Sequence, residues 1–244
     1  MEDKIIYEVL RVMNGKPIFL ENHLRRMKNS FELIGEKFTL SDAEISIKID
    51  NLIKNENKSE GNIKITYGVY EKILKVFFVE HSYPSNEMYE NGVKTILYFG
   101  ERENPNAKVV DENFREKVNR EIKDENAYEA ILVDKNGYIT EGSKSNIFMV
   151  KGNELLTSPL KAVLPGVTRG EIIKIAEKLG IKIKEVEYKY LDIDKLDGMF
   201  ISGTSPKVLP IKSVNNINLD SNNDIIRKLN KEYNSNISQY IKNH

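Results

Sequence analysis

The chain of 244 residues contains no cysteine. This absence excludes a disulfide framework, a thiolate nucleophile and any cysteine-ligated metal or iron–sulfur site. Histidine is scarce, and His23, His81 and His244 are too far apart for an HExxH zinc site. An excess of one charge is also missing, because Lys+Arg and Asp+Glu both total 37. No basic surplus is therefore available for nonspecific nucleic-acid binding.

Long apolar runs are lacking as well. No segment approaches the ~18 apolar residues that span a bilayer, and the first residues lack the apolar region of a signal peptide. Hydrophobic residues nevertheless make up 40% of the chain, which is enough to form a core. We expect a cytoplasmic protein with no nucleic-acid or membrane partner. Its chemistry would depend on polar side chains or on an organic cofactor, and no metal site is expected.

The N-terminal part combines alternating and helical patterns. Ile5, Tyr7 and Val9 alternate on one face of a predicted strand. Asn14 and Gly15 predict a hairpin turn before a return strand over 17–20. Apolar spacings of three and four predict a helix over 21–36, and a second helix over 42–52 could be capped by Ser41 and Asp42. Further strands are predicted over 63–69, 73–80 and 92–99.

The C-terminal part begins after a polar stretch with one proline, which predicts an interdomain link. Strand pairs mixed with separate helices predict an α+β architecture in two domains. The expected ranges are 1–100 for a small N-terminal domain, 101–107 for the link and 108–244 for a larger C-terminal domain. Within the last range, helices are predicted over 111–125, 172–179 and 220–241, and strands over 130–133, 137–140, 146–150, 154–157, 181–186 and 198–202.

Three short segments carry residues suited to binding an anion or a cofactor. Thr168 and Glu171 form a T-x-x-E pattern, which predicts a capping box and a helix N-terminus that attracts phosphate. Glu141 lies in the small polar run 140–146, where it could line a cleft. The run 202–206 contains Gly203 and hydroxyl residues, whose backbone N–H groups could face an anion. Each segment also has a plainer interpretation: an ordinary capped helix, a solvated loop and a simple turn.

Two basic residues add to these segments. Arg26 lies next to the apolar face of the first predicted helix and could reach inward, although pairing with a carboxylate is the more common role of such an arginine. Lys108 follows the polar link, and on its own it carries almost no information in a lysine-rich chain.

Together, in this order, the motifs resemble the fold-type IV pyridoxal-phosphate enzymes, also called class IV aminotransferases. The family includes branched-chain and D-amino-acid aminotransferases and aminodeoxychorismate lyase. The run 128–148 is similar to the family's E-A-L-x-L-D…E-G-S-x-S-N-I-F signature. The run 165–169 resembles its P-G-I-T-R, and 202–205 with 208–211 resembles its S/T-G-T-x…V-x-P-V. The likeness covers about 5–241.

The resemblance implies a small α/β domain, a larger domain and pyridoxal 5′-phosphate between them. It makes Lys108 the Schiff-base lysine and Glu141 the partner of the pyridine nitrogen. It places the phosphate on Arg26, Val167 and Thr168. Further cofactor and substrate contacts fall to Thr204 and Ser205, and Tyr7 lines the substrate pocket.

The activity implied is amino transfer between an amino acid and a 2-oxo acid, in a homodimer. Aminodeoxychorismate lyase, which releases pyruvate, and a noncatalytic binding protein are the alternatives. Two departures from the family pattern bear on this choice. Asp111 stands where the family has asparagine after the lysine. The chain also starts almost at the first conserved strand, so one wall of the pocket is expected to be missing or rebuilt.

Overall fold

The computed structural model describes residues 3–244, which form two compact units. The first unit contains residues 3–82, 106–110 and 235–244; the second contains 83–105 and 111–234. This grouping differs from the expected ranges 1–100, 101–107 and 108–244, because 83–100 lie in the second unit and Lys108 in the first. Within residues 3–244, no helix has the length and apolar character needed to cross a membrane.

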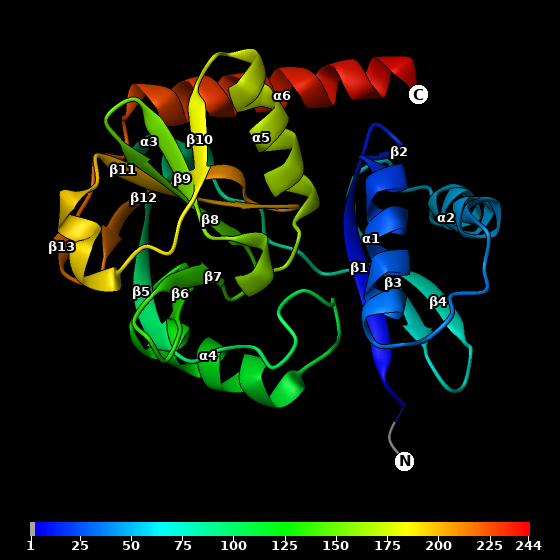
Figure 1. Cartoon of the computed structure of the whole chain (residues 1–244). Helices are drawn as coiled ribbons and strands as arrows, with labels where there is room; N and C mark the ends of the chain where they lie inside the picture. The colour runs from blue at the N-terminus through cyan, green and yellow to red at the C-terminus, as the bar shows by residue number, and fades with distance from the viewer. Residues whose placement is uncertain (1–2) are drawn as a thin grey trace. The chain divides into compact units, whose positions relative to one another are not determined.

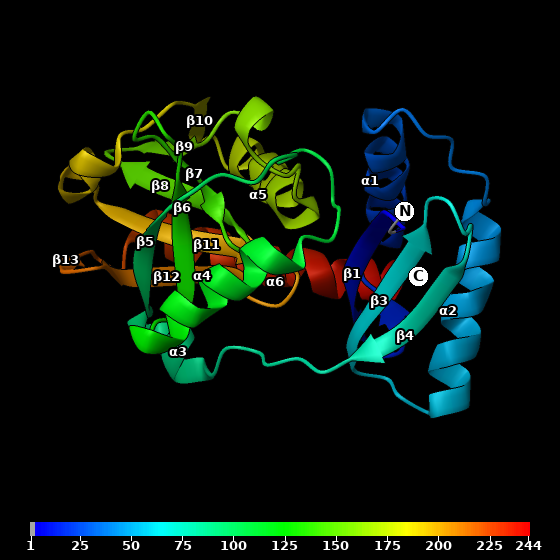
Figure 2. The same ribbon diagram turned by 90° about the horizontal axis from the view of Figure 1, so that it is seen from below.

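The first unit is built on a four-stranded antiparallel sheet in the order β2-β1-β3-β4. Helices α1 and α2 pack against one face of it (Figures 1 and 2). The shared core contains Leu10 of β1, Met27 and Phe31 of α1, and Ile45 and Ile49 of α2. The elements are β1 (Ile5–Met13), β2 (Lys16–Pro17), α1 (Leu20–Leu33), α2 (Asp42–Glu56), β3 (Gly61–Gly68) and β4 (Leu74–Val79).

Two predictions for this unit need correction. The strand at Ile5 alternates as expected, but the face with Ile6 and Leu10 supplies the core, while Ile5 is 37% exposed. The return strand predicted over 17–20 is shorter: β2 pairs with β1 only at Lys16 and Pro17. Phe19 adopts a φ of 55° in the left-handed region, which ends the pairing and lets α1 begin at Leu20. The cap of α2 is confirmed, since Ser41 and Glu44 form a complete capping box.

The segment 106–110 joins the free edge of β1. The backbone N–H of Tyr7 donates to the carbonyl of Lys108 at 3.1 Å, and the N–H of Val110 donates to the carbonyl of Ile5 at 3.1 Å. The backbone N–H of Lys108 also donates to the hydroxyl of Ser30 at 3.2 Å. Backbone pairing therefore holds Lys108 at a fixed position along β1.

The second unit contains a nine-stranded sheet in the order β10-β9-β8-β11-β12-β5-β6-β7, with β13 beside β12. Strands β12, β5 and β6 run parallel to one another, and most other pairs are antiparallel. The strands are β5 (Val93–Phe99), β6 (Glu129–Val133), β7 (Ile139–Gly142), β8 (Asn146–Lys151), β9 (Glu154–Thr157), β10 (Lys182–Glu185), β11 (Gly198–Gly203), β12 (Lys207–Val214) and β13 (Ile217–Asn218).

Four further α-helices and two short 3-10 helices complete the described residues. They are α3 (Asn86–Asn91), α4 (Glu112–Asp124), α5 (Val167–Lys178), α6 (Asp224–Asn243), η1 (Leu160–Ala162) and η2 (Tyr190–Lys195). Sequence periodicity did not predict α3, which has only six residues and no buried side chain.

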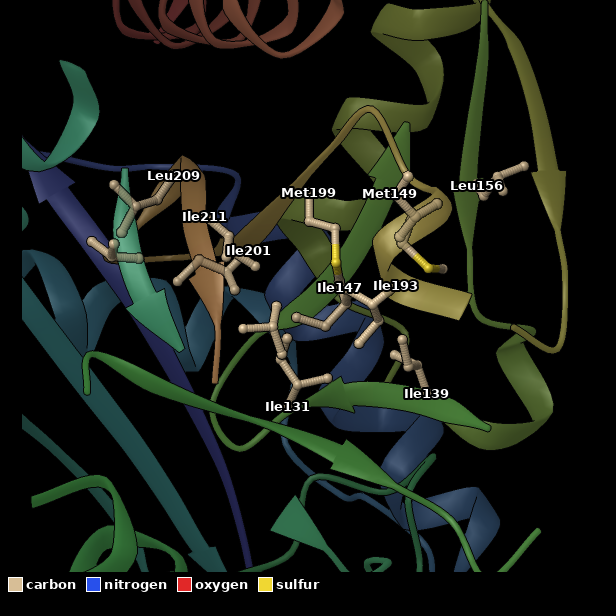
Figure 3. Close-up of a cluster of buried hydrophobic side chains, with 13 residues drawn as sticks. Ile131, Ile139, Ile147, Met149, Leu156, Ile193, Met199, Ile201, Leu209 and Ile211 are labelled. Carbon is tan, nitrogen blue, oxygen red and sulfur yellow. The ribbon is translucent and has the colours of Figure 1, made fainter. Parts of the chain in front are cut away.

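Buried aliphatic side chains from several strands form the core of the second unit (Figure 3). Ile147 of β8 lies opposite Ile201 of β11 in this cluster. Phe148 of β8 and Phe200 of β11, the neighbours of these two isoleucines in sequence, stack with their ring centroids 4.9 Å apart. The strands of this core include β7, which carries Glu141, and β11, which leads into the turn with Thr204 and Ser205.

Candidate active site

Lys108 lies beside an aromatic ring in the first unit. Its side chain is half-buried, and its Nζ atom is 4.6 Å from the centroid of the Tyr7 ring. The Nζ atom of Lys64 is 5.2 Å from the same centroid. The electron-rich face of the ring attracts both ammonium groups. Tyr7 thereby restricts where the Lys108 amine can lie, while backbone hydrogen bonds fix its main chain.

Arg26 is buried, as expected for a residue that reaches inward, and it pairs with Glu8 of β1. Its Nε and NH2 atoms donate to the two Glu8 oxygens at 2.8 and 2.5 Å. Nδ1 of the buried His23 donates to Glu8 at 2.8 Å. Burial raises the pKa of Glu8, but the Arg26 charge and these hydrogen bonds outweigh it and hold the pKa at about 2.

Burial also lowers the pKa of His23, although the hydrogen bond to Glu8 opposes that shift. The cluster is thus a carboxylate bound by one arginine and one neutral imidazole. Sequence reasoning missed Glu8. Its signal was available: Glu8 falls at an inward position of the alternating strand, between Ile6 and Leu10.

Glu141 is buried at 3% exposure at the end of β7, so it is not a solvated loop carboxylate. One oxygen accepts from NH1 of Arg102 at 3.1 Å, and the other accepts from the backbone N–H of Leu164 at 2.9 Å. These two donors fix the carboxylate in one orientation. Arg102 was missed because it lies 39 residues away in sequence, without a motif of its own.

The predicted capping box of Thr168 and Glu171 is wrong. Helix α5 begins at Val167 with Gly166 as its N-cap, and no side chain caps its first turn. Thr168 is already inside the helix, where its hydroxyl accepts from Tyr233 at 3.3 Å, and Glu171 pairs with Lys174 at 2.7 Å. A capping side chain must come from the non-helical N-cap residue, and glycine offers none. The first-turn N–H groups therefore have no side-chain cap.

The turn after β11 contains Thr204 and Ser205, both partly buried. The neighbouring Ser202 is 1% exposed, and its hydroxyl has no hydrogen-bond partner among residues 3–244. A buried polar atom without a partner is costly. The last residues of β11, next to this turn, thus contain a hydroxyl with unused hydrogen-bonding capacity.

A second buried carboxylate, Glu129 of β6, organises the loop that follows Glu141. It accepts hydrogen bonds from the N–H and hydroxyl of Ser143 at 3.1 and 2.5 Å, from the N–H of Lys144 at 3.3 Å and from the hydroxyl of Ser145 at 3.1 Å. Sequence reasoning did not single out Glu129, although it lies within the motif that carried the resemblance. The loop is therefore fixed by hydrogen bonds to a buried carboxylate.

Thus Tyr7, Arg26 and Lys108 belong to the first unit. The other predicted site residues belong to the second unit: Glu141, Val167, Thr168, Thr204 and Ser205.

Comparison with known proteins agrees with these motifs. A family model described as amino-transferase class IV matches residues 5–214. A D-alanine aminotransferase of Bacillus licheniformis is 26% identical over 222 residues, which cover 86% of this chain and 78% of that protein.

Solved structures share the fold. The crystal structure of a putative branched-chain amino acid aminotransferase from Thermotoga maritima matches with a TM-score of 0.86 and 26% identity, covering 99% of this chain and 87% of that one. A putative 4-amino-4-deoxychorismate lyase from Legionella pneumophila matches with a TM-score of 0.86 and 22% identity, covering 96% and 91%. The predicted α+β, fold-type IV architecture is confirmed. The chain belongs to the class IV aminotransferase family.

Proposed function

We propose that this protein is a pyridoxal-5′-phosphate-dependent aminotransferase that moves an amino group between an amino acid and a 2-oxo acid. The observation that carries the proposal is the state of Glu141: a buried carboxylate held in one orientation by Arg102 and Leu164. Such a fixed negative charge is what a protonated pyridine nitrogen requires.

The residues present fit this cofactor. The phosphate needs donors, and the first turn of α5 offers N–H groups without a side-chain cap, next to the Thr168 hydroxyl. The unpartnered hydroxyl of Ser202 adds hydrogen-bonding capacity. A carboxylate offers about four lone-pair sites, so Glu141 can take part in several hydrogen bonds at once. When bound, the cofactor supplies the electron sink for charge that develops at the substrate carbon.

Each residue then has a task. Lys108 provides the amine that binds the cofactor and afterwards moves the proton of the substrate carbon. Glu141 keeps a proton on the ring nitrogen. Arg26, Val167 and Thr168 bind the phosphate. The turn with Thr204 and Ser205 binds the cofactor and the substrate carboxylate, and Tyr7 lines the substrate pocket. The structural likeness to a putative lyase leaves pyruvate release as the second candidate activity.

The test is a visible absorbance spectrum of the purified protein with pyridoxal 5′-phosphate, followed by a panel of amino acids. We expect cofactor absorbance that changes with an amino donor, and amino transfer to 2-oxoglutarate. Lys108→Ala should abolish amino transfer, whereas Lys161→Ala, at a side chain 73% exposed, should change neither the absorbance nor the transfer. Pyruvate release from aminodeoxychorismate would favour the lyase. The absence of cofactor absorbance in the wild type would contradict the proposal.

We further propose that the protein is a homodimer, because most soluble homo-oligomers have two-fold symmetry and resemblance to the family implies one. Analytical ultracentrifugation should give twice the chain mass of 28.1 kDa. A fully active monomer would refute this assignment.

A further inference from the structure

Two side chains of one motif bind the same residue of a distant loop. Oε2 of Glu141 accepts from the backbone N–H of Leu164 at 2.9 Å. Nδ2 of Asn146 donates to the backbone carbonyl of the same Leu164 at 2.9 Å. Both side chains are buried, at 3% and 5% exposure. Leu164 is thus held at its amide by Glu141 and at its carbonyl by Asn146. We call these two hydrogen bonds the clamp.

This clamp lies directly before helix α5. Leu164 is followed by Pro165 and by Gly166, the N-cap of the helix. The clamp therefore connects the Glu141 carboxylate to the first turn of α5 through three residues of main chain. The proline limits the freedom of that connection, since its φ is fixed.

Gly166 gives independent evidence that Asn146 is closely fitted. A methyl group at Gly166 would collide with Oδ1 of Asn146. The φ of Gly166 is −63°, which alanine also adopts, so glycine is not required for the backbone. Its role here is to leave room for the Asn146 amide.

The link between Glu141 and Asn146 is also fixed. Glu129 binds Ser143, Lys144 and Ser145, and the N–H of Gly142 donates to the carbonyl of Ser145 at 2.8 Å. A movement of Asn146 cannot be absorbed easily by this loop, so it is transmitted to Leu164 and to the hydrogen bond that Leu164 donates to Glu141.

We propose that Asn146 is a positioning residue that keeps the Glu141 carboxylate at a fixed distance from the phosphate-binding first turn of α5. This inference rests on the proposed function, in which Glu141 serves the ring nitrogen and α5 the phosphate of one rigid cofactor. A rigid ligand requires its two anchors to keep a fixed separation, and Asn146 fixes that separation through its hydrogen bond to Leu164.

The first test is amide hydrogen exchange of Leu164, measured by NMR on the cofactor-free protein. Asn146→Ala should speed this exchange by about tenfold, the scale of one buried hydrogen bond. Thr95→Val is the matched control, because it removes a side-chain bond to a carbonyl, that of Ser213, elsewhere in the same unit. It should leave Leu164 exchange unchanged.

The second test is the pH at which the absorbance of bound pyridoxal 5′-phosphate titrates. Asn146→Ala should shift it in the same direction as Glu141→Gln, and Thr95→Val should not. In Asn146→Asp, only the protonated acid can donate to Leu164, so Leu164 exchange should approach the wild-type rate as the pH falls.

A folded Asn146→Ala protein with wild-type Leu164 exchange and wild-type absorbance titration would overturn the proposal. Should that variant not fold, Gly166→Ala provides the test, because the added methyl group displaces the Asn146 amide from the other side. An unchanged rate of Leu164 exchange in Gly166→Ala would then contradict the proposal. If the wild type binds no cofactor, the proposed function fails, and the clamp is judged on Leu164 exchange alone.

Discussion

The ammonium group of Lys108 lies 4.6 Å from the centroid of the Tyr7 ring, and the backbone of Tyr7 donates to the carbonyl of the same lysine. Side chain and main chain of Tyr7 thus position one residue together. Reduction with borohydride in the presence of pyridoxal 5′-phosphate, followed by peptide mapping, should place the label on Lys108. A label on Lys144 or Lys161 would contradict the assignment.

Arg26→Ala should weaken cofactor binding about ten- to a hundred-fold, since a hydrogen bond to a charged group contributes roughly 1.5–3 kcal/mol. The variant also leaves the buried Glu8 carboxylate without its cation, which costs about 3–5 kcal/mol of stability. The double variant Glu8→Gln/Arg26→Ala separates the two effects. It should regain stability but not cofactor affinity, as measured by urea unfolding and by cofactor titration. Normal cofactor affinity in the double variant would show that Arg26 pairs with Glu8 and does not bind the cofactor.

The Glu8 cluster predicts how stability depends on pH. The pKa of Glu8 is about 2 in the folded protein against an ordinary 4.5. Because the unfolded state binds the proton more readily, roughly 3 kcal/mol of stability is present above pH 4.5 and is lost as the pH falls toward 2. The lowered pKa of His23 acts with the same sign below its ordinary 6.5. Urea unfolding measured across this range should show that the free energy of unfolding of His23→Gln falls less between pH 6.5 and 4.5 than that of the wild type. An equal fall in both proteins would show that His23 does not contribute to the pH dependence.

Glu141→Gln keeps the shape of the side chain but removes its charge. The pKa of the ring nitrogen should fall, and each unit of that fall is about 1.4 kcal/mol of lost stabilisation. Single-turnover rates with a good amino donor should therefore drop by orders of magnitude while cofactor remains bound. Glu177→Gln, at an exposed position of α5, is the control. A near-normal rate in Glu141→Gln would require withdrawal of its assigned role.

Glu129→Gln replaces one acceptor oxygen by a donor that faces the N–H and hydroxyl donors of the 143–145 loop. We expect a loss of about 1–3 kcal/mol, because buried donors are left unsatisfied. Chemical unfolding measures it. Glu125→Gln, whose side chain is 62% exposed, should change stability by less than about 0.5 kcal/mol. Equal effects in the two variants would show that the Glu129 contacts contribute little.

The sequence was informative where function requires short, contiguous patterns. The runs around Glu141 and 165–169 identified the family, which comparison confirmed. The sequence misled where one local pattern permits two geometries. A T-x-x-E pattern fits a capping box only if Thr168 precedes the helix, and packing starts α5 at Val167 instead.

Other features could not be predicted because they depend on contacts between distant segments. Nothing local to Arg102 indicates that it binds Glu141. Asn146 likewise reveals its role only once Leu164 is placed beside it. Glu8 is intermediate, since its inward position was readable, but its partners His23 and Arg26 were not assigned to it.

The pairing of segment 106–110 with the edge of β1 has a consequence for how such a chain can diverge. The position of Lys108 is set by a bridge between Ile6 and Val109 and not by the length of the preceding loop. Insertions or deletions within 103–105, beyond the Arg102 that binds Glu141, would change that loop and leave the lysine in place. A two-residue slip of β1 would carry the lysine about 6–7 Å along the strand. Selection can therefore vary the length of the loop between Arg102 and Lys108 while the spacing within β1 stays constrained.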